Sequence, residues 1–154
     1  MNLNLEDRLD KNGSLLYHID IALKFIYTTR EEQGKILVHC IEGKSRSPSI
    51  VIAYLMDSQE LSLLKSYQHV KNLRFITEPN SNFLDQLGEY EKNIWLLKYG
   101  KESSSLEDTK IWLNSNTNTV KPLLVNTSKF EQTRDPPKRF SLETYLSNMN
   151  TSLF

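Results

Sequence analysis

One short stretch, residues 38–48 with the sequence VHCIEGKSRSP, gathers most of the residues of this chain that could carry out chemistry. It holds the only cysteine, Cys40, followed closely by a glycine, a lysine, two serines and an arginine. A lone cysteine is more often a small buried hydrophobe than a reactive thiol. The surroundings of Cys40 therefore decide between these two interpretations.

The triplet Gly43-Lys44-Ser45 matches the end of the nucleotide-binding pattern G-x-x-x-x-G-K-[ST]. That pattern also requires a glycine at the position where Val38 stands. Because this first glycine is absent, the sequence does not predict a nucleotide triphosphate site.

The 40–46 loop instead has the composition of a cradle for a phosphate dianion. Its main-chain N–H groups can converge on the phosphate oxygens, and a helix starting directly after it would point its positive dipole end at the same place. Gly43 permits a backbone conformation that a side chain would resist. Arg46 offers a planar fork that holds two oxygens, which a lysine cannot do. We predict a phosphate-binding loop made of Ile41, Glu42, Gly43, Lys44, Ser45 and Arg46.

The same positive surroundings would convert Cys40 into a nucleophile. A free thiol has a pKa of about 8.5, but beside a cation at a helix N-terminus it falls to about 3.5 to 7.5, where the thiolate predominates. Cys40 could then attack phosphorus in line and carry the phosphoryl group as a cysteinyl-phosphate. His39 and Ser47 could tune the thiolate by hydrogen bonds, and Ser47 could also help it to leave in the second step.

Helices and one short strand are predicted around the 40–46 loop. Apolar residues at spacings of three and four predict amphipathic helices over residues 14–30, 62–73 and 80–99. Pro48 suits the first turn of a further helix, which starts at Ser47 and is apolar nearly all round, hence central. The run KILVH, residues 35–39, favours a strand that is buried on both faces.

The composition limits the class of protein. The 154 residues are 38% apolar, enough for the core of one domain, and 19 basic residues balance 19 acidic ones. Without net charge, no long-range field favours nucleic acid or an anionic membrane as a partner. No apolar run is long enough to span a membrane, residues 1–10 do not resemble a secretory signal, and a single cysteine suits a reducing compartment. We therefore expect a cytoplasmic protein, with the nucleus as the alternative location.

These residues carry a resemblance to a known family. HCIEGKSRS, residues 39–47, matches the signature H-C-x-x-G-x-x-R-[ST] of the cysteine-dependent protein tyrosine phosphatases, and SRSPSIVIAYLM, residues 45–56, is similar to their dual-specificity branch. The resemblance extends from about Leu3 to Asn93 and includes SLLKSYQHVKNLRF and EPNSNFLDQLGEYE. It implies that residues 1–100 are the C-terminal portion of a catalytic domain that hydrolyses phosphotyrosine and phosphoserine or phosphothreonine in proteins, without metal or cofactor.

The resemblance also implies a general acid, because an alkoxide leaving group must be protonated as it departs. In the family this acid is an aspartate on a loop upstream of the cysteine. Asp7 and Asp10 both lie at a suitable separation from Cys40, and we favour Asp7 because LNLED, residues 3–7, is similar to the family's strand end. The alternative for either residue is a solvated acid near a helix start.

The fold that the resemblance implies is α/β, with a parallel or mixed sheet flanked by helices. The family places several strands and a helix before the acid loop, whereas only 39 residues precede Cys40. We therefore expect the N-terminal strands of the sheet to be absent. We also expect the isolated chain to be poorly stable, because a sheet of one or two strands exposes its edges and apolar faces.

Residues 101–154 do not share this resemblance. They are rich in serine, threonine and asparagine, and their apolar residues come in short, separated clusters. We expect a polar, loosely ordered tail whose clusters could dock on the domain or on a partner.

Other functions remain open on the sequence alone. A chain without its N-terminal strands could be a phosphoprotein-binding pseudophosphatase or a regulatory fragment. Lys44 could also bind a further phosphate of a phosphoinositide substrate, but the neighbouring Glu42 carries the opposite charge and argues against this. Arsenate reductases and rhodaneses use a similar loop, but no second cysteine is present to resolve a disulfide. The expected partner is therefore a phosphorylated protein, with kinases as the family-level expectation.

Overall fold

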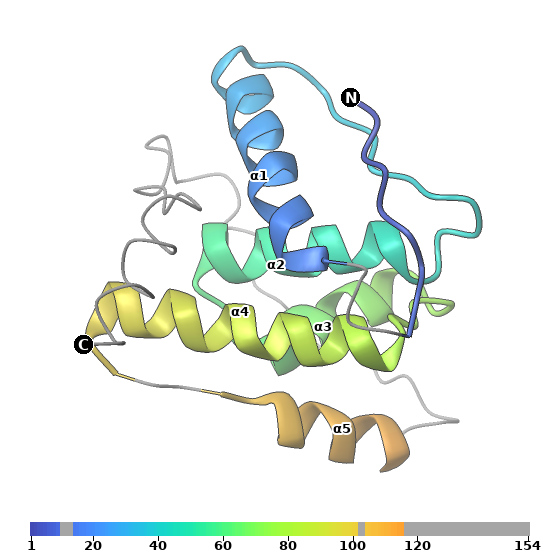
Figure 1. Ribbon diagram of the computed structural model, residues 1–154, viewed down its shortest axis with the longest axis vertical. Helices are drawn as coiled ribbons and strands as arrows, with labels where there is room; N and C mark the ends of the chain where they lie inside the picture. The colour runs from blue at the N-terminus through green and yellow to red at the C-terminus, as the bar shows by residue number, and fades with distance from the viewer. Residues whose placement is uncertain (10–13, 102–103, 116–154) are drawn as a thin grey trace.

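Helix α2 (Arg46–Gln59) lies at the centre of the computed structural model, which describes residues 1–9, 14–101 and 104–115 (Figure 1). Apolar residues on all of its sides are buried, Ile52 and Ala53 completely so. The central position predicted from its composition is confirmed. The helices that pack against it are α1 (Leu15–Glu31), α3 (Leu63–Leu73) and α4 (Ser81–Tyr99).

Polar caps set the ends of the other helices. Ser14, Ser62 and Asn80 immediately precede α1, α3 and α4, and each side chain accepts a hydrogen bond from the N–H group three residues further on. Gly100 ends α4 with a φ of 62°, a conformation that favours glycine. The predicted helix boundaries are confirmed closely, because both apolar spacing and capping are local signals. None of the helices in the described part of the chain has the length and apolar character needed to cross a membrane.

Helix α5 (Leu106–Ser115) lies in the segment for which we expected a loosely ordered tail. It packs against α3 and α4, and the ring of Trp112 meets that of the buried Tyr67 edge to face, with centroids 6.0 Å apart. The expectation of loose order is therefore wrong for residues 106–115, because their apolar side chains find a surface on the helices to cover. Residues 116–154 lie outside the described residues, and the division of the chain at residue 100 stays a prediction.

A buried carboxylate connects three of these helices. Glu91 on α4 is fully buried, and its Oε1 accepts a hydrogen bond of 2.9 Å from the Leu63 N–H at the start of α3. Its Oε2 accepts from the Ser105 N–H, directly before α5, at 2.6 Å. The first N–H groups of a helix have no partner within their own helix, and the positive end of the helix dipole favours an anion. Glu91 therefore serves as a shared cap for α3 and α5.

The strand predicted over residues 35–39 is not formed. Figure 1 shows residues 35–40 and residues 1–8 as extended traces beside the helices, and the described residues contain no β-strand. The reason is that no main-chain hydrogen bond joins either trace to another described segment, and a strand exists only through such pairing. The sheet expected from the resemblance is therefore not confirmed, and the described architecture is helical.

We predict that Glu91→Ala exposes the starts of α3 and α5 to solvent. Because buried N–H donors left without an acceptor cost about 1 to 3 kcal/mol each, amide hydrogen exchange at Leu63 and Ser105 should become roughly ten- to a hundredfold faster. Nuclear magnetic resonance measures both rates in one experiment. The control is Glu107→Ala on α5, whose side chain is 80% exposed and whose loss should leave the two amides unchanged. Equal rates in wild type and Glu91→Ala would contradict the capping role.

Candidate active site

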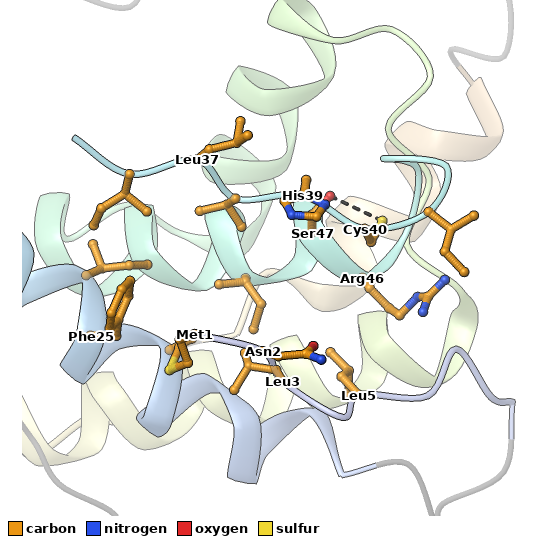
Figure 2. Close-up of a pocket in the computed structure, with 16 residues that line it drawn as sticks. Met1, Asn2, Leu3, Leu5, Phe25, Leu37, His39, Cys40, Arg46 and Ser47 are labelled. Atoms are coloured by element: carbon orange, nitrogen blue, oxygen red, sulfur yellow. Dashed lines mark hydrogen bonds between the residues drawn. The ribbon is translucent and has the colours of Figure 1, made fainter.

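Cys40 lies where the extended trace turns into the loop before α2. Its Sγ accepts a hydrogen bond from the Gly43 N–H at 3.2 Å. It accepts another from the Ser47 hydroxyl at 3.3 Å, which Figure 2 shows as a dashed line. One donor comes from the loop and the other from the first turn of α2. The loop and the first turn of α2 therefore hold the Cys40 sulfur between them.

The pKa of the Cys40 thiol is the balance of opposing effects. Burial raises this pKa, whereas hydrogen bonds from the Ser47 hydroxyl, from the Ser47 main chain and from the Gly43 N–H lower it, as does the positive charge of Arg46. The stabilising groups outweigh burial, and the pKa of Cys40 lies below its ordinary value. The predicted contact of Ser47 with the sulfur is present.

Arg46, the first residue of α2, faces the carboxylate of Asp7. The Arg46 Nε lies 3.7 Å from the Asp7 Oδ2, and the two side chains are 26% and 35% exposed. This Nε is itself buried and makes no hydrogen bond to any other described group. A buried guanidinium donor without a hydrogen bond is unusual, and it leaves the fork of Arg46 able to bind an anion.

Asp7 is held between the loop and the start of α4. Its Oδ1 accepts hydrogen bonds from the Ser45 hydroxyl at 3.0 Å and from the Asn80 Nδ2 at 2.6 Å. The Asn80 Oδ1 caps α4 by accepting from the Phe83 N–H at 2.8 Å. The Asn80 side chain thus caps α4 and also holds the Asp7 carboxylate beside the loop. The structure places Asp7 in the site, whereas Asp10 lies outside the described residues.

Arg74, at the end of α3, contacts the loop although the sequence analysis did not identify it. Its Nε donates to the Gly43 carbonyl at 2.9 Å and its Nη2 to the Glu42 carbonyl at 3.4 Å. Gly43 has a φ of +66°, and a Cβ atom there would lie only 2.5 Å from the Arg74 Nη2. The positive φ therefore favours glycine here, and a larger residue would also displace the end of the Arg74 side chain. A single arginine at a helix end carries no sequence signal, because such residues are usually solvated.

The next two carbonyls of the loop are also bound from outside. The Glu78 N–H donates to the Lys44 carbonyl at 2.7 Å, and the Ser49 N–H and hydroxyl donate to the Ser45 carbonyl at 3.0 and 2.8 Å. Lys44 forms an ion pair with Glu78, at 2.8 Å, and the hydrogen bond of this pair raises the pKa of Lys44. The carbonyls of the loop are thus engaged by α2 and by the α3–α4 connection.

The main-chain N–H groups of the loop have few partners in comparison. Gly43 donates to the Cys40 sulfur. The remaining five N–H groups donate to no other described group, and they belong to Ile41, Glu42, Lys44, Ser45 and Arg46. The phosphate-binding role predicted for these residues stays a prediction, and these free donors are consistent with it.

His39 is exposed and forms no hydrogen bond to Cys40, so its predicted tuning of the thiolate stays a prediction. No cluster of three or more histidine, cysteine, aspartate or glutamate side chains in the described part of the chain is arranged to hold a metal ion.

Comparison with known proteins places the chain in a family. Residues 1–93 match the family described as "Dual specificity phosphatase, catalytic domain". "Dual specificity protein phosphatase 5" of Rattus norvegicus is 44% identical over 77 residues, which cover 50% of this chain and 20% of the relative. "Dual specificity protein phosphatase 1" of Arabidopsis thaliana is 41% identical over 88 residues, which cover 57% of this chain and 43% of the relative. The chain belongs to the dual specificity phosphatase catalytic-domain family.

A solved structure supports the same assignment. The crystal structure of the "human tyrosine phosphatase-like serine/threonine/tyrosine-interacting protein" has a TM-score of 0.56 and 33% sequence identity, covering 61% of this chain and 60% of that chain. The described helices therefore share the fold of this family. The chain spans less than half the length of the two curated relatives.

We predict that Ser47→Ala raises the pKa of Cys40. The Ser47 hydroxyl donates to the sulfur and stabilises the thiolate more than the thiol, so its removal favours the protonated form. The midpoint of the ultraviolet thiolate absorbance should move to higher pH. The matched control is Ser58→Ala at the other end of α2, because the Ser58 hydroxyl is buried and has no hydrogen-bond partner among the described groups. An unchanged midpoint in Ser47→Ala would contradict this assignment.

Proposed function

We propose that this chain hydrolyses phosphotyrosine and phosphoserine or phosphothreonine in proteins through a cysteinyl-phosphate intermediate. One observation carries the proposal: a cysteine with a lowered pKa shares a loop with free N–H donors and with Arg46, whose Nε lacks a hydrogen bond. Membership of the dual specificity phosphatase family supports it. The curated relatives extend well beyond the matched region, so we propose this activity for the chain from its own residues.

In the first step the Cys40 thiolate attacks the phosphorus of the substrate. The bond between phosphorus and the leaving oxygen breaks, its electron pair passes to that oxygen, and Asp7, in its protonated form, supplies the proton. Arg46 and the free N–H groups of the loop bind the remaining phosphate oxygens, where negative charge is greatest in the transition state. These donors cost no reorganisation because the carbonyls of the loop are already bound elsewhere.

In the second step water attacks the phosphorus of the cysteinyl-phosphate. Asp7, now a carboxylate, accepts a proton from this water, and the sulfur–phosphorus bond breaks to release inorganic phosphate. The departing thiolate is stabilised by the hydroxyl of Ser47, which already lies 3.3 Å from the sulfur. Asn80 and Ser45 act as positioning residues, because they hold the carboxylate of Asp7 beside the loop.

The second candidate is a phosphoprotein-binding module without turnover. It is favoured by the absence of a sheet from the described residues, since only the side-chain contacts of Asp7 with Ser45, Arg46 and Asn80 then hold it beside the loop. One matched structure also belongs to a protein named as phosphatase-like and interacting. We prefer the enzyme because Cys40, Arg46 and Asp7 come together in one site.

Substrate class and location are parts of the proposal. Lys44 is engaged by Glu78, which argues for a phosphoprotein rather than a phosphoinositide. A kinase as the substrate and the cytoplasm as the location stay predictions.

We also propose that residues 35–39 become a strand of a parallel or mixed sheet when a neighbouring strand is present.

We predict that Cys40→Ser abolishes hydrolysis of an aryl phosphate and of a doubly phosphorylated peptide, because a serine hydroxyl is not ionised at neutral pH.

Arg46→Lys should lower kcat about 10²- to 10³-fold, since a lysine cannot bind two oxygens in the same plane. Phosphate release and phosphopeptide affinity are measured for each variant. Retained affinity with no turnover in the wild type would favour the binding module, and equal turnover in wild type and Cys40→Ser would exclude the enzyme.

We predict that the loss of the acid depends on the leaving group. Asp7→Asn should lower kcat about 10²- to 10⁴-fold for phenyl phosphate, whose leaving oxygen needs a proton, and far less for dinitrophenyl phosphate, whose leaving oxygen is a weak base. The matched control is Asp10→Asn, which should resemble wild type with both substrates. The reverse result, with only Asp10→Asn sensitive to the leaving group, would assign the acid to Asp10.

A further inference from the structure

Arg74, at the end of α3, binds two successive carbonyl groups of the 40–46 loop with one side chain. Its Nε donates to the Gly43 carbonyl at 2.9 Å and its Nη2 to the Glu42 carbonyl at 3.4 Å. An exposed arginine loses rotamer freedom when it is held in this way. The catalytic steps proposed above do not use this side chain, and its hydrogen bonds act on the loop rather than on the substrate.

Each of these two carbonyls shares a peptide group with an N–H group of the loop. The peptide groups of the described residues are trans, and in a planar trans peptide group the C=O and N–H bonds point in opposite directions. The Gly43 carbonyl is joined in this way to the Lys44 N–H, and the Glu42 carbonyl to the Gly43 N–H. A side chain that binds both carbonyls therefore turns both N–H groups away from itself.

Both N–H groups thus point to one side of the loop, the side of the Cys40 sulfur. The Gly43 N–H donates to this sulfur at 3.2 Å, whereas the Lys44 N–H donates to no other described group. Successive N–H groups on one side form an anion-binding concavity when one residue has the left-handed conformation, and Gly43 has a φ of +66°. The Lys44 N–H is therefore directed to the place where a substrate phosphate would meet the nucleophile.

The next two carbonyls of the loop do not depend on Arg74. The Lys44 carbonyl accepts from the Glu78 N–H at 2.7 Å. The Ser45 carbonyl accepts from the Ser49 N–H and hydroxyl at 3.0 and 2.8 Å. The effect of Arg74 should therefore be confined to the two peptide groups whose carbonyls it binds.

We propose that Arg74 is a positioning residue that directs the Lys44 N–H toward the bound phosphate. The same side chain keeps the Gly43 N–H on the Cys40 sulfur. The proposal rests on the proposed function in one respect, because it takes this loop as the site that binds the anion. Arg74 acts through its hydrogen bonds and not through its charge, since the positive charge that lowers the pKa of Cys40 is that of Arg46.

Two variants of Arg74 separate the hydrogen bond from the charge. The glutamine amide nitrogen lies at the same place along the side chain as the arginine Nε, so Arg74→Gln loses the charge but can still donate to the Gly43 carbonyl. Methionine is of similar length and has no donor, so Arg74→Met loses both. The matched control is Lys65→Met, which removes one positive charge from an exposed position on α3.

Tungstate, a tetrahedral dianion, is the probe, and nuclear magnetic resonance of the full chain follows the amide signals as it is added. In the wild type the amides of Lys44, Ser45 and Arg46 should all respond. In Arg74→Met the Lys44 response should be lost while the other two remain, because their peptide groups are held from elsewhere.

Two further readouts are expected to change in Arg74→Met. Tungstate affinity should fall about ten- to a hundredfold, as for the loss of one hydrogen bond to a charged ligand. The midpoint of the Cys40 thiolate absorbance should move to higher pH, because the Gly43 N–H is no longer held on the sulfur. Arg74→Gln and Lys65→Met should keep the Lys44 response and bind tungstate nearly as tightly as the wild type.

Wild-type affinity and an intact Lys44 response in Arg74→Met would overturn the proposal. So would an Arg74→Gln variant that behaves like Arg74→Met, because the charge would then be what acts. Loss of all three amide responses would show that Arg74 maintains the loop as a whole, which also overturns its assignment to one N–H group. An absent tungstate response in the wild type would overturn it whatever the turnover.

Hydrolysis of phenyl phosphate separates this proposal from the proposed function. The expected pattern of tungstate binding without turnover in the wild type would refute only the enzyme. Turnover in the wild type together with unchanged tungstate binding in Arg74→Met would refute only the positioning role of Arg74.

Discussion

The arrangement of the candidate site depends on where the carbonyl groups of the 40–46 loop are bound. Four consecutive carbonyls, those of Glu42, Gly43, Lys44 and Ser45, accept hydrogen bonds from Arg74, from the Glu78 N–H and from Ser49. These carbonyls have donors outside the loop, and five of the six N–H groups of residues 41–46 donate to no other described group. A loop with free donors and a cation beside it can bind an anion and stabilise a thiolate.

This constraint explains why the helices around the loop matter to its chemistry. The residues that engage the carbonyls come from the first turn of α2 and from the connection between α3 and α4, while Asn80 at the start of α4 holds Asp7. Packing of α2 against α3 and α4 therefore brings these groups to the loop. The shared cap at Glu91 couples α4 to the starts of α3 and α5, which extends the same support to the C-terminal helix.

Residues 35–39 are the part of the fold in which the structure differs from the expected sheet. These residues have the apolar run and the alternating exposure of a strand, but strand formation needs main-chain partners, which can lie anywhere in a sequence. Helices differ in this respect, because their hydrogen bonds and caps lie within a few residues. That difference explains why the helices were predicted closely and why the predicted strand was not found.

The sequence by itself determined the helices, the caps and the reactive loop, because apolar spacing, a capping side chain and the order of Cys40, Gly43 and Arg46 act over short distances along the chain. Tertiary structure alone decided that Arg74 binds the loop carbonyls, that Asp7 meets Asn80 and Arg46, and that residues 106–115 form a packed helix. Each of these contacts joins residues far apart in the chain or depends on a surface built by other helices. No local pattern encodes them, since a solvated arginine and a bound one look the same in sequence.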